Sequence, residues 1–238
     1  MKVLGIIPAR GGSRRVPKKN IRLLAGEPLI LYTIEAALKS KHINRLIVST
    51  DDPEIAKVAE EYGAEVPFLR PASLAQDDTP DQPVFQHALE SLKEHDGYEP
   101  DIVVHLRPTT PLKTPQTIDK VIEKMRETKA DIVRTMTPVE GVHHPYWMYS
   151  LSENGRTTPI MKNIKVSEYY QSQLLPPVNR ISCVADAMKA SLIHEGVILD
   201  SNNMIGVVTS LEESIDIDTD FDFLLAECLL QMKVKEWL

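Results

Sequence analysis

The fifteen residues IIPARGGSRRVPKKN, positions 6–20, join an apolar run to a basic loop that contains a Gly-Gly pair. Upstream residues extend the apolar run to KVLGIIPA (2–9), a β-branched pattern typical of a strand buried on both faces. Strands of this kind belong to parallel sheets that helices cover on both sides. The stretch therefore predicts an α/β fold with a basic loop at the carboxyl end of its first strand.

The rest of the chain alternates short apolar strands with amphipathic helices. This alternation predicts a Rossmann-like, doubly wound, mostly parallel sheet of the nucleotidyltransferase type, in a single domain over residues 1–238. We expect helices over 28–40, 54–63, 83–95, 117–129 and 221–230, and further strands over 45–50, 65–69, 101–107 and 131–139.

Residues 138–185 interrupt the alternation. This segment predicts a dimerisation or substrate arm instead of a second domain. Exposed aromatic side chains would suit the contact surface of a homodimer, and packing back onto the parent sheet is an equal alternative. The segment combines prolines with aromatic residues, namely Pro138, Pro145, Pro159, Pro176 and Pro177 with Tyr146, Trp147, Tyr149, Tyr169 and Tyr170.

The composition is that of a soluble globular protein. Hydrophobic residues make up 42% and charged residues 26% of the 238 residues, and the absence of a run of 18 apolar residues argues against a membrane span. The cysteines, Cys183 and Cys228, lie far apart without metal-ligand spacing, which favours a reducing, cytoplasmic setting.

Charge is distributed unevenly along the chain, whose formal net charge is −7. A basic segment of this kind can bind nucleic acid, but aromatic residues amount to only 5% and Gly, Pro and Asn interrupt the charges, so a compact polyphosphate is the better-fitting ligand. Residues 1–26 contain no acidic residue and carry Lys2, Arg10, Arg14, Arg15, Lys18, Lys19 and Arg22.

The loop after the first strand has the residue types of an anion site. Gly11 and Gly12 would let backbone N–H groups approach an anion, and Ser13 offers a hydroxyl. Neither GxxxxGK[ST] nor GxGxxG occurs, which argues against a P-loop NTPase and a classical dinucleotide fold. A solvated basic turn is the remaining alternative.

Paired carboxylates occur near the other end of the chain, in SIDIDTD (214–220). On an extended strand, Asp216 and Asp218 would point to the same face and repel each other unless a cation such as Mg²⁺ lay between them. The alternative is helix capping, because Asp218, Thr219 and Asp220 precede the predicted helix. Spacing alone does not decide between the two.

The segment PARGGSRRVPKKN closely resembles the opening motif of the cytidylyltransferases that activate nine-carbon and related acidic sugars, where the pattern is ARxGSKxxxxKN. Further resemblances follow in order: IVSTDDPEIAKVAEEYGAEV, LRPASLAQDDT, LRPTTPL and SIDIDTDFDFLLAE. The family resemblance implies transfer of CMP from CTP to the anomeric hydroxyl of a 2-keto-3-deoxy sugar acid with release of pyrophosphate. It also assigns Mg²⁺ binding to Asp216 and Asp218.

The resemblance further implies roles for individual residues. Arg10 and Lys19 would stabilise triphosphate charge, Asp218 would help deprotonate the sugar hydroxyl, Asn20 would lie near the ribose and Arg70 would contact cytosine. The expected nucleotide-binding set is Ala9, Arg10, Gly11, Gly12, Ser13, Lys19, Asn20, Arg70, Thr79 and Pro80, and the expected sugar-acid set is Gln82, Arg107, Thr109 and Arg180.

The chain departs from the family pattern at several positions. Arg107 replaces a glutamine and Gln82 stands where serine is common. Ile181-Ser182-Cys183 takes the place of an Asn-Gly turn within residues 179–193, and Arg15 stands where glycine is common. These departures affect the sugar acid more than the nucleotide.

The leading hypothesis is an enzyme acting on a sialic-acid-like nonulosonate with CTP and Mg²⁺, without nucleic-acid or membrane partners. LRPT and LLPPV favour the legionaminic acid branch. The alternatives are a cytidylyltransferase for an eight-carbon 3-deoxy sugar acid and a nucleotide-binding homologue that has lost catalysis.

Overall fold

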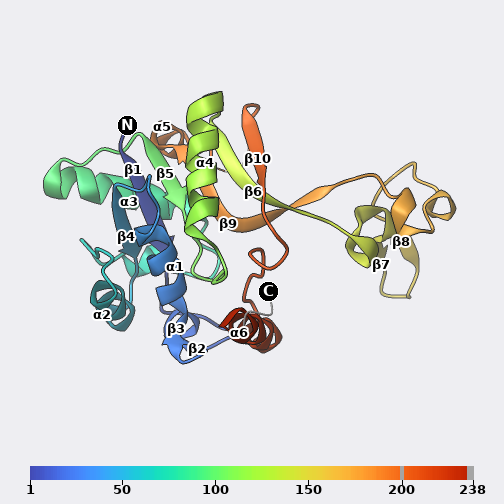
Figure 1. Cartoon of the computed structure of the whole chain (residues 1–238), viewed down its shortest axis with the longest axis horizontal. Coiled ribbons are helices and arrows are strands. Elements are labelled where there is room, and N and C mark those ends of the chain that lie inside the picture. Colours follow the sequence, from blue (N-terminus) through green and yellow to red (C-terminus); the bar gives the residue numbers. More distant parts are fainter. Residues whose placement is uncertain (199–200, 235–238) are drawn as a thin grey trace.

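The computed structural model describes residues 1–198 and 201–234, and it confirms an α/β fold built on a mostly parallel sheet (Figure 1). The six-stranded sheet has the order β10-β6-β9-β5-β1-β4, and only β9 runs antiparallel to its neighbours. Its strands are β1 (Val3–Pro8), β4 (Arg45–Ser49), β5 (Ile102–His105), β6 (Ile132–Pro138), β9 (Asn179–Lys189) and β10 (Met204–Val208).

Helices cover both faces of the sheet, as the alternating pattern predicts. Within β1, Val3 and Ile7 pack with the first group of helices, whereas Leu4 and Ile6 pack with the second. Strand β1 is thus apolar throughout because both of its faces are buried. The first group is α1 (Leu29–Leu38), α2 (Pro53–Glu61) and α4 (Pro115–Thr128), and the second is α3 (Asp81–Asp96) and α5 (Ala190–His194).

Local capping sets the starts of two helices. The Asp52 side chain accepts a hydrogen bond from the Glu54 amide, and Pro53 occupies the first turn of α2, as the Asp-Asp-Pro triplet predicts. Thr114 caps α4 in the same way by accepting from the Thr117 amide.

The C-terminal helix α6 (Asp220–Val234) packs near the start of the chain. Its residues Phe223 and Ala226 form a third apolar cluster with Leu24, Leu29 and Ile217. Leu24 belongs to the small hairpin of β2 (Leu23–Leu24) and β3 (Glu27–Pro28), which follows the basic loop. This cluster brings the segment 214–220 next to the basic loop.

Three predictions of secondary structure need correction. Residues 65–69 form only two isolated parallel bridges, Ile47 with Glu65 and Thr50 with Leu69, because Pro67 cannot donate to a ladder. The segment 214–220 is an extended connection outside any strand. Residues 179–185 belong to β9 and not to the arm, which therefore covers 139–178.

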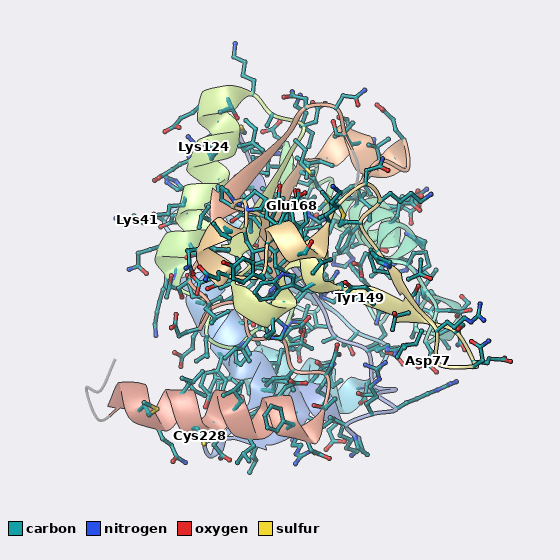
Figure 2. The ribbon with its side chains drawn as sticks, turned by 90° about the vertical axis from the view of Figure 1, so that its right-hand side faces the viewer. Lys41, Asp77, Lys124, Tyr149, Glu168 and Cys228 are labelled. Atoms are coloured by element: carbon teal, nitrogen blue, oxygen red, sulfur yellow. The ribbon has the colours of Figure 1, made fainter. Side chains whose placement is uncertain are left out.

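The arm projects away from the sheet, and Figure 2 looks onto its far end, where Tyr149 and Glu168 lie. Its own contacts hold it: the Trp147 indole donates to the Tyr169 carbonyl at 2.7 Å, and the Tyr146 and Tyr169 rings meet edge to face. In this structure the arm thus extends from the sheet and is held by contacts within itself. The arm contains β7 (Tyr149–Leu151), β8 (Thr157–Pro159) and 3-10 turns at Gly141–His143, Pro145–Trp147, Val166–Glu168 and Ser172–Leu174.

Strand β9 carries a bulge beside β6. The register with β6 shifts between Arg134 and Met136, and Cys183 within the bulge has φ 58°, a left-handed conformation. The Thr135 hydroxyl accepts from the amides of Val184 and Ala185, which satisfies backbone groups that the bulge removes from the ladder. Cys183 thus adopts a left-handed conformation within the segment that replaces the Asn-Gly of the family pattern.

A buried ion pair lies next to this bulge. The Arg134 guanidinium donates to Asp186 Oδ2 at 2.9 and 3.2 Å, and both residues are about 95% buried, with exposed fractions of 5% and 4%. Asp186 also accepts from the Thr135 amide. Removing one charge would leave the other unpaired in a low-dielectric interior.

Asp186→Asn should therefore lower the free energy of unfolding by about 3 kcal/mol, measured by urea denaturation. Glu99→Gln, which removes an exposed pair with Lys93, is the control and should change it by less than about 0.5 kcal/mol. Equal losses in the two variants would show that the buried pair has no special role in stability.

Among the described residues, no helix has the length and apolar character needed to cross a lipid bilayer.

Candidate functional site

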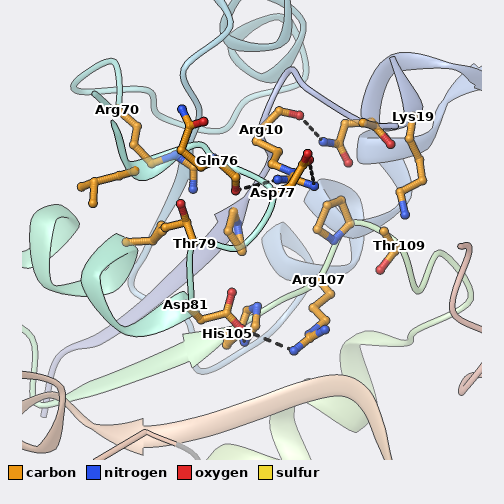
Figure 3. A pocket seen from close by; sticks show the side chains of 16 residues that line it. Arg10, Lys19, Arg70, Gln76, Asp77, Thr79, Asp81, His105, Arg107 and Thr109 are labelled. Carbon is orange, nitrogen blue, oxygen red and sulfur yellow. Dashed lines mark hydrogen bonds and ion pairs between the residues drawn. The ribbon is translucent and has the colours of Figure 1, made fainter. Parts of the chain in front are cut away.

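A cavity of about 220 Å³ opens at the carboxyl ends of β1 and β5, where the strand order reverses (Figure 3). Ligands bind at this position in open α/β sheets. Most of the predicted nucleotide and sugar residues meet here. The lining is Pro8, Arg10, Ser13, Lys19, Asn20, Arg70, Leu74, Gln76, Asp77, Thr79, Asp81, Val84, His105, Arg107, Pro108 and Thr109.

Arg10 lies across the mouth of the cavity in contact with the loop at 71–80. Its guanidinium donates to the Gln76 carbonyl at 2.6 Å and pairs with the Asp77 carboxylate at 2.9 Å. Asp77 also pairs with the exposed Arg14. The Asn20 amide donates to the Arg10 carbonyl at 2.9 Å and so fixes the backbone of the basic loop. Two of the loop's cations are therefore neutralised by one carboxylate of the same chain.

The two glycines of the loop differ in their surroundings. A Cβ atom on Gly11 would lie 2.6 Å from Asp52 Oδ2, so only glycine fits, and the Gly11 amide already donates to Asp51 Oδ1 at 3.0 Å. Gly12 has open space around its Cα. The close approach that Gly11 permits is therefore to Asp51 and Asp52.

Arg70 forms the inner wall of the cavity and is 5% exposed. Its backbone amide donates to the Thr50 carbonyl, and its guanidinium lies 3.8 Å from Asp51 Oδ1. Burial lowers the pKa of the guanidinium, and nearby Asp51 opposes that shift. Nε is buried without a hydrogen-bond partner, so it is an available donor beside the cavity.

Lys19 connects the cavity to the C-terminal carboxylates. Its Nζ donates to the Ile217 carbonyl at 2.6 Å and lies 3.3 Å from Asp218 Oδ1. The guanidinium of the exposed Arg15 approaches the same carboxylate at 4.0 Å. Arg15, a departure from the family pattern, thus adds a second cation beside Asp218.

The start of α6 decides the capping question. Thr219 Oγ1 accepts from the Asp222 amide, and the Asp222 carboxylate accepts from the Thr219 amide at 2.8 Å, a reciprocal capping arrangement. Asp222 also accepts from the Asp218 amide. The side chains of Asp216 and Asp218 take no part, so helix capping leaves both carboxylates free for another role.

Asp216 and Asp218 suit a hard divalent cation. Ile217 between them is fully buried in the third apolar cluster, and Asp216 Oδ1 is buried without a hydrogen-bond partner. The described residues contain no group of three or more His, Cys, Asp or Glu side chains placed to hold a metal. Two carboxylates fit Mg²⁺, which often takes its remaining ligands from water and substrate phosphates.

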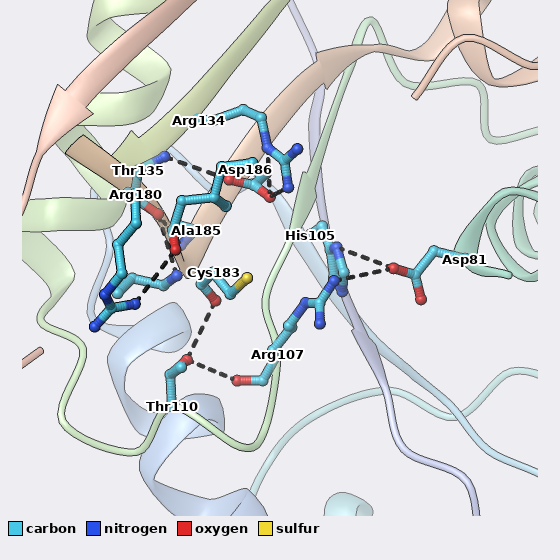
Figure 4. Close-up of polar contacts among 12 residues, drawn as sticks. Asp81, His105, Arg107, Thr110, Arg134, Thr135, Arg180, Cys183, Ala185 and Asp186 are labelled. Atoms are coloured by element: carbon cyan, nitrogen blue, oxygen red, sulfur yellow. Dashed lines mark hydrogen bonds and ion pairs between the residues drawn. The ribbon is translucent and has the colours of Figure 1, made fainter. Parts of the chain in front are cut away.

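A second cluster lies on the opposite wall, with Asp81, His105 and Arg107 (Figure 4). Asp81 Oδ2 lies 3.4 Å from the Arg107 guanidinium and 3.9 Å from His105 Nδ1. The His105 ring also packs edge to face on Phe85. Burial lowers the pKa of His105 to about 4, although the carboxylate of Asp81 opposes the shift. His105 is therefore neutral at physiological pH.

Some predicted residues lie outside this cavity. Ala9 is buried and donates its amide to Ser49, while Gly12 and Pro80 are absent from the lining. Gln82 donates to Gln86 and to the Ile193 carbonyl, toward α5, so its neighbour Asp81 takes the place in the cavity. Arg180 donates to Ser214 at 2.8 Å and lines a separate cavity of about 470 Å³ at the base of the arm.

Among the site residues that sequence reasoning did not assign are Asp77 and Lys113. Asp77 belongs to an acidic loop, and no sequence pattern places its carboxylate against Arg10. Lys113 is buried beneath the cavity, where a lysine is not expected from sequence.

A model of the cytidylyltransferase family matches residues 4–234. The chain belongs to this family. This cytidylyltransferase is 34% identical to CMP-N,N'-diacetyllegionaminic acid synthase of Legionella pneumophila, over 98% of the chain and 97% of the relative. It is 40% identical to pseudaminic acid cytidylyltransferase of Campylobacter jejuni over 59% of the chain and 60% of that relative.

Further similarities support the same placement. N-acylneuraminate cytidylyltransferase of Escherichia coli is 28% identical over 99% of the chain and 54% of that relative. The fold matches that of CMP:2-keto-3-deoxy-manno-octonic acid synthetase complexed with CTP, with a TM-score of 0.73, 16% identity, and 98% and 100% of the two chains covered. The cytidylyltransferase is thus an enzyme of the nucleotidyltransferase class.

The neutral His105 generates a prediction about pH and stability. The unfolded chain takes up a proton on this residue below pH 6.5, whereas the folded chain does so only near pH 4, so stability falls as the pH drops between these values. His105→Gln should remove a loss on the order of 3 kcal/mol across this window, measured by urea denaturation at each pH.

The exposed His95 of α3 provides the control, because His95→Gln leaves the His105 environment intact. A His105→Gln variant whose stability follows the wild-type pH curve would contradict the prediction.

Proposed function

We propose that this enzyme transfers CMP from CTP to the anomeric hydroxyl of a nine-carbon 2-keto-3-deoxy sugar acid of the legionaminic or sialic type. The observation that carries the proposal is the meeting of two distant segments at one rim of the cavity, where Lys19 lies 3.3 Å from Asp218. A triphosphate needs positive charge from the loop and from a metal ion. Lys19 of the loop lies beside Asp218, one of the two carboxylates that would hold the metal. The activities of the related cytidylyltransferases are consistent with this chemistry.

The nucleotide would lie along the basic wall. Arg10, Lys19 and the Ser13 hydroxyl would bind the triphosphate, with Asn20 near the ribose. Cytosine O2 and N3 both accept hydrogen bonds, and Arg70, which lines the cavity, has a buried Nε without a hydrogen-bond partner. Thr79, on the loop at 71–80, would border the nucleotide.

Mg²⁺ held by Asp216 and Asp218 would supply charge neutralisation and polarisation of the α-phosphate. The anomeric oxygen of the sugar attacks the α-phosphorus in line, the bond to the bridging oxygen of the β-phosphate breaks, and pyrophosphate leaves. The Asp218 carboxylate takes the hydroxyl proton. The chain contributes mainly by orientation and by fixed positive charge from Arg10 and Lys19.

The sugar acid would occupy the wall that contains Arg107 and Thr109. Arg107 would bind the sugar carboxylate while Asp81 orients its guanidinium. Arg180, at the base of the arm, would contact a more distant substituent of a nine-carbon chain. The alternative acceptor is an eight-carbon 3-deoxy sugar acid, because a 3-deoxy-manno-octulosonate cytidylyltransferase is 31% identical to this chain over 90% of the chain's residues.

A reaction panel tests the proposal directly. The protein is incubated with each of the four ribonucleoside triphosphates, Mg²⁺ and either nine-carbon or eight-carbon 2-keto-3-deoxy acids, and pyrophosphate release is measured. We expect release with CTP and a nine-carbon acid. Release with the eight-carbon acid alone would replace the substrate assignment, and CTP binding without release would favour a non-catalytic homologue.

Asp216→Asn and Asp218→Asn should each lower kcat by at least about 100-fold, because each removes a charge from the metal site. Their thermal unfolding midpoints should stay close to that of the wild type, since neither carboxylate supports the fold. The matched control is Asp220→Asn, whose carboxylate pairs with Arg22 outside the site. Wild-type turnover in both site variants would refute the metal assignment.

We also propose that the protein forms a homodimer through the arm, in a reducing cytoplasmic compartment. The support is a set of apolar side chains that the arm exposes, including Val142, Leu151 and Tyr170 with exposed fractions of 75%, 73% and 68%. Surfaces of this kind are typical of protein interfaces. Both cysteines are free thiols, which suits a reducing compartment.

Light scattering should give a mass twice the 26.8 kDa of one chain. Leu151→Asp combined with Tyr170→Asp should shift it to the mass of one chain, because charges would be buried at the contact. Leu38→Asp, which alters an exposed apolar side chain on the body, should leave the mass unchanged. A monomeric wild type would exclude this assembly.

A further inference from the structure

Lys113 is a buried ammonium directly beneath the cavity. Its side chain is only 5% exposed, and Nζ donates to the carbonyls of Arg107 and Thr110 at 2.6 and 2.7 Å. The hydroxyls of Thr110 and Thr33 accept from the same Nζ, each at 2.9 Å. The ammonium therefore closes the turn 107–110 on itself and attaches it to helix α1.

The turn that Lys113 holds contacts the main parts of the site. It begins with Arg107, which faces Asp81 across the cavity. The carbonyl of Thr109 accepts the Ile217 amide at 2.8 Å, so the turn also carries the segment between Asp216 and Asp218. The turn therefore connects Arg107, which faces Asp81, to the segment that contains Asp216 and Asp218.

The same turn reaches the bulge of β9. The Thr110 hydroxyl lies 3.4 Å from the carbonyl of Cys183, within the segment where the chain departs from its family (Figure 4). This hydroxyl also accepts from Lys113. Lys113 thus holds a turn whose residues contact Asp81, the segment 216–218 and the bulge of β9.

Burial of the Lys113 charge has an unfavourable free energy. Burial lowers the pKa of Lys113 to about 7, and the attraction of the Asp216 and Glu213 carboxylates opposes this shift. In the described part of the chain the hydrogen-bond partners of Nζ are carbonyl and hydroxyl oxygens. A buried charge without a direct ionic partner reduces stability relative to an apolar residue of similar volume. Its contribution is therefore expected in the arrangement of the site.

We propose that Lys113 is a positioning residue, which holds the turn 107–110 and through it the Asp216–Asp218 segment in the geometry for transfer. The inference deepens the proposed function and depends on it for its kinetic consequence. The structural consequence, protection of the Ile217 amide, is independent of any substrate. The two consequences can therefore be measured separately.

The test compares Lys113→Met with Ile118→Ala. Ile118 is fully buried in the core on helix α4, which begins two residues after Lys113, and its truncation should lower stability by roughly 2–5 kcal/mol without touching the turn. Lys113→Met keeps the volume but removes the donors, which leaves the Arg107 and Thr110 carbonyls without their ammonium partner.

Hydrogen exchange of the ligand-free proteins is the first readout. Amide exchange in the peptide 214–218 should accelerate at least about tenfold in Lys113→Met relative to the wild type, and stay at the wild-type rate in Ile118→Ala. Similar exchange in both variants would overturn the inference, whatever the enzyme activity.

Steady-state kinetics is the second readout. Lys113→Met should lower kcat about 100-fold because the reacting groups are misplaced, while KM for CTP should change less than about threefold, since Arg10, Lys19 and Arg70 bind the nucleotide from other segments. Ile118→Ala should keep wild-type kcat below its unfolding temperature. Equal kcat in the two variants would overturn the positioning role.

The experiments distinguish failure of the proposed function from failure of the Lys113 proposal. A wild type that transfers CMP to no acid refutes the proposed function, and the exchange experiment still decides whether Lys113 holds the 214–218 segment. If Lys113→Met does not fold, Thr33→Val removes one acceptor of the ammonium and should accelerate the same exchange by a smaller factor. Unchanged exchange in that variant would then count against the proposal.

Discussion

Burial of β1 on both faces is the constraint from which the site follows. Side chains along the strand alternate between two helical layers, so the strand has no place for a charged residue until it emerges beyond Pro8. The cations of the first segment are therefore concentrated in one loop at the edge of the sheet. Strand β5 ends beside it, and the crevice between the two ends is where the fold can bind a ligand.

The sequence predicts the elements whose signals are local. Apolar periodicity identifies α1 to α4 and strands β1, β4, β5 and β6, and the cap at Asp52 follows from the Asp-Asp-Pro triplet. Elements that depend on distant partners are harder to predict. Residues 65–69 have strand composition but meet β4 at only two bridges. Strand β9 is hard to predict because its partners lie 41 (Pro138 to Asn179) to 87 (Ile102 to Lys189) residues away.

The same distinction applies to the site. Arg10, Lys19, Arg70 and Arg107 were predictable because each stands at a position of a family motif that the sequence resembles, and the structure places all four at one cavity. Gln82 was not, because one residue along a helix rotates the side chain by about 100°, which turns position 82 toward α5 and position 81 toward the cavity.

Arg107 and Asp81 also change how the departure from the family should be interpreted. An arginine in place of a neutral glutamine would add a positive charge to the sugar wall. The Asp81 carboxylate, 3.4 Å away, cancels much of that charge, so the two residues together change shape and hydrogen-bonding pattern more than electrostatic potential.

The Asp77 carboxylate pairs with Arg10 and Arg14 and would compete with an anionic ligand for these two cations. This carboxylate is tethered to the same chain as Arg10 and Arg14, so it is present at a high effective concentration whenever the cavity is empty. A solute with a single charge gains little by displacing it, whereas a triphosphate offers several charges for the one it replaces. Ligand entry would thus be an exchange of anions, and the loop would favour polyvalent ligands before any base or sugar is recognised.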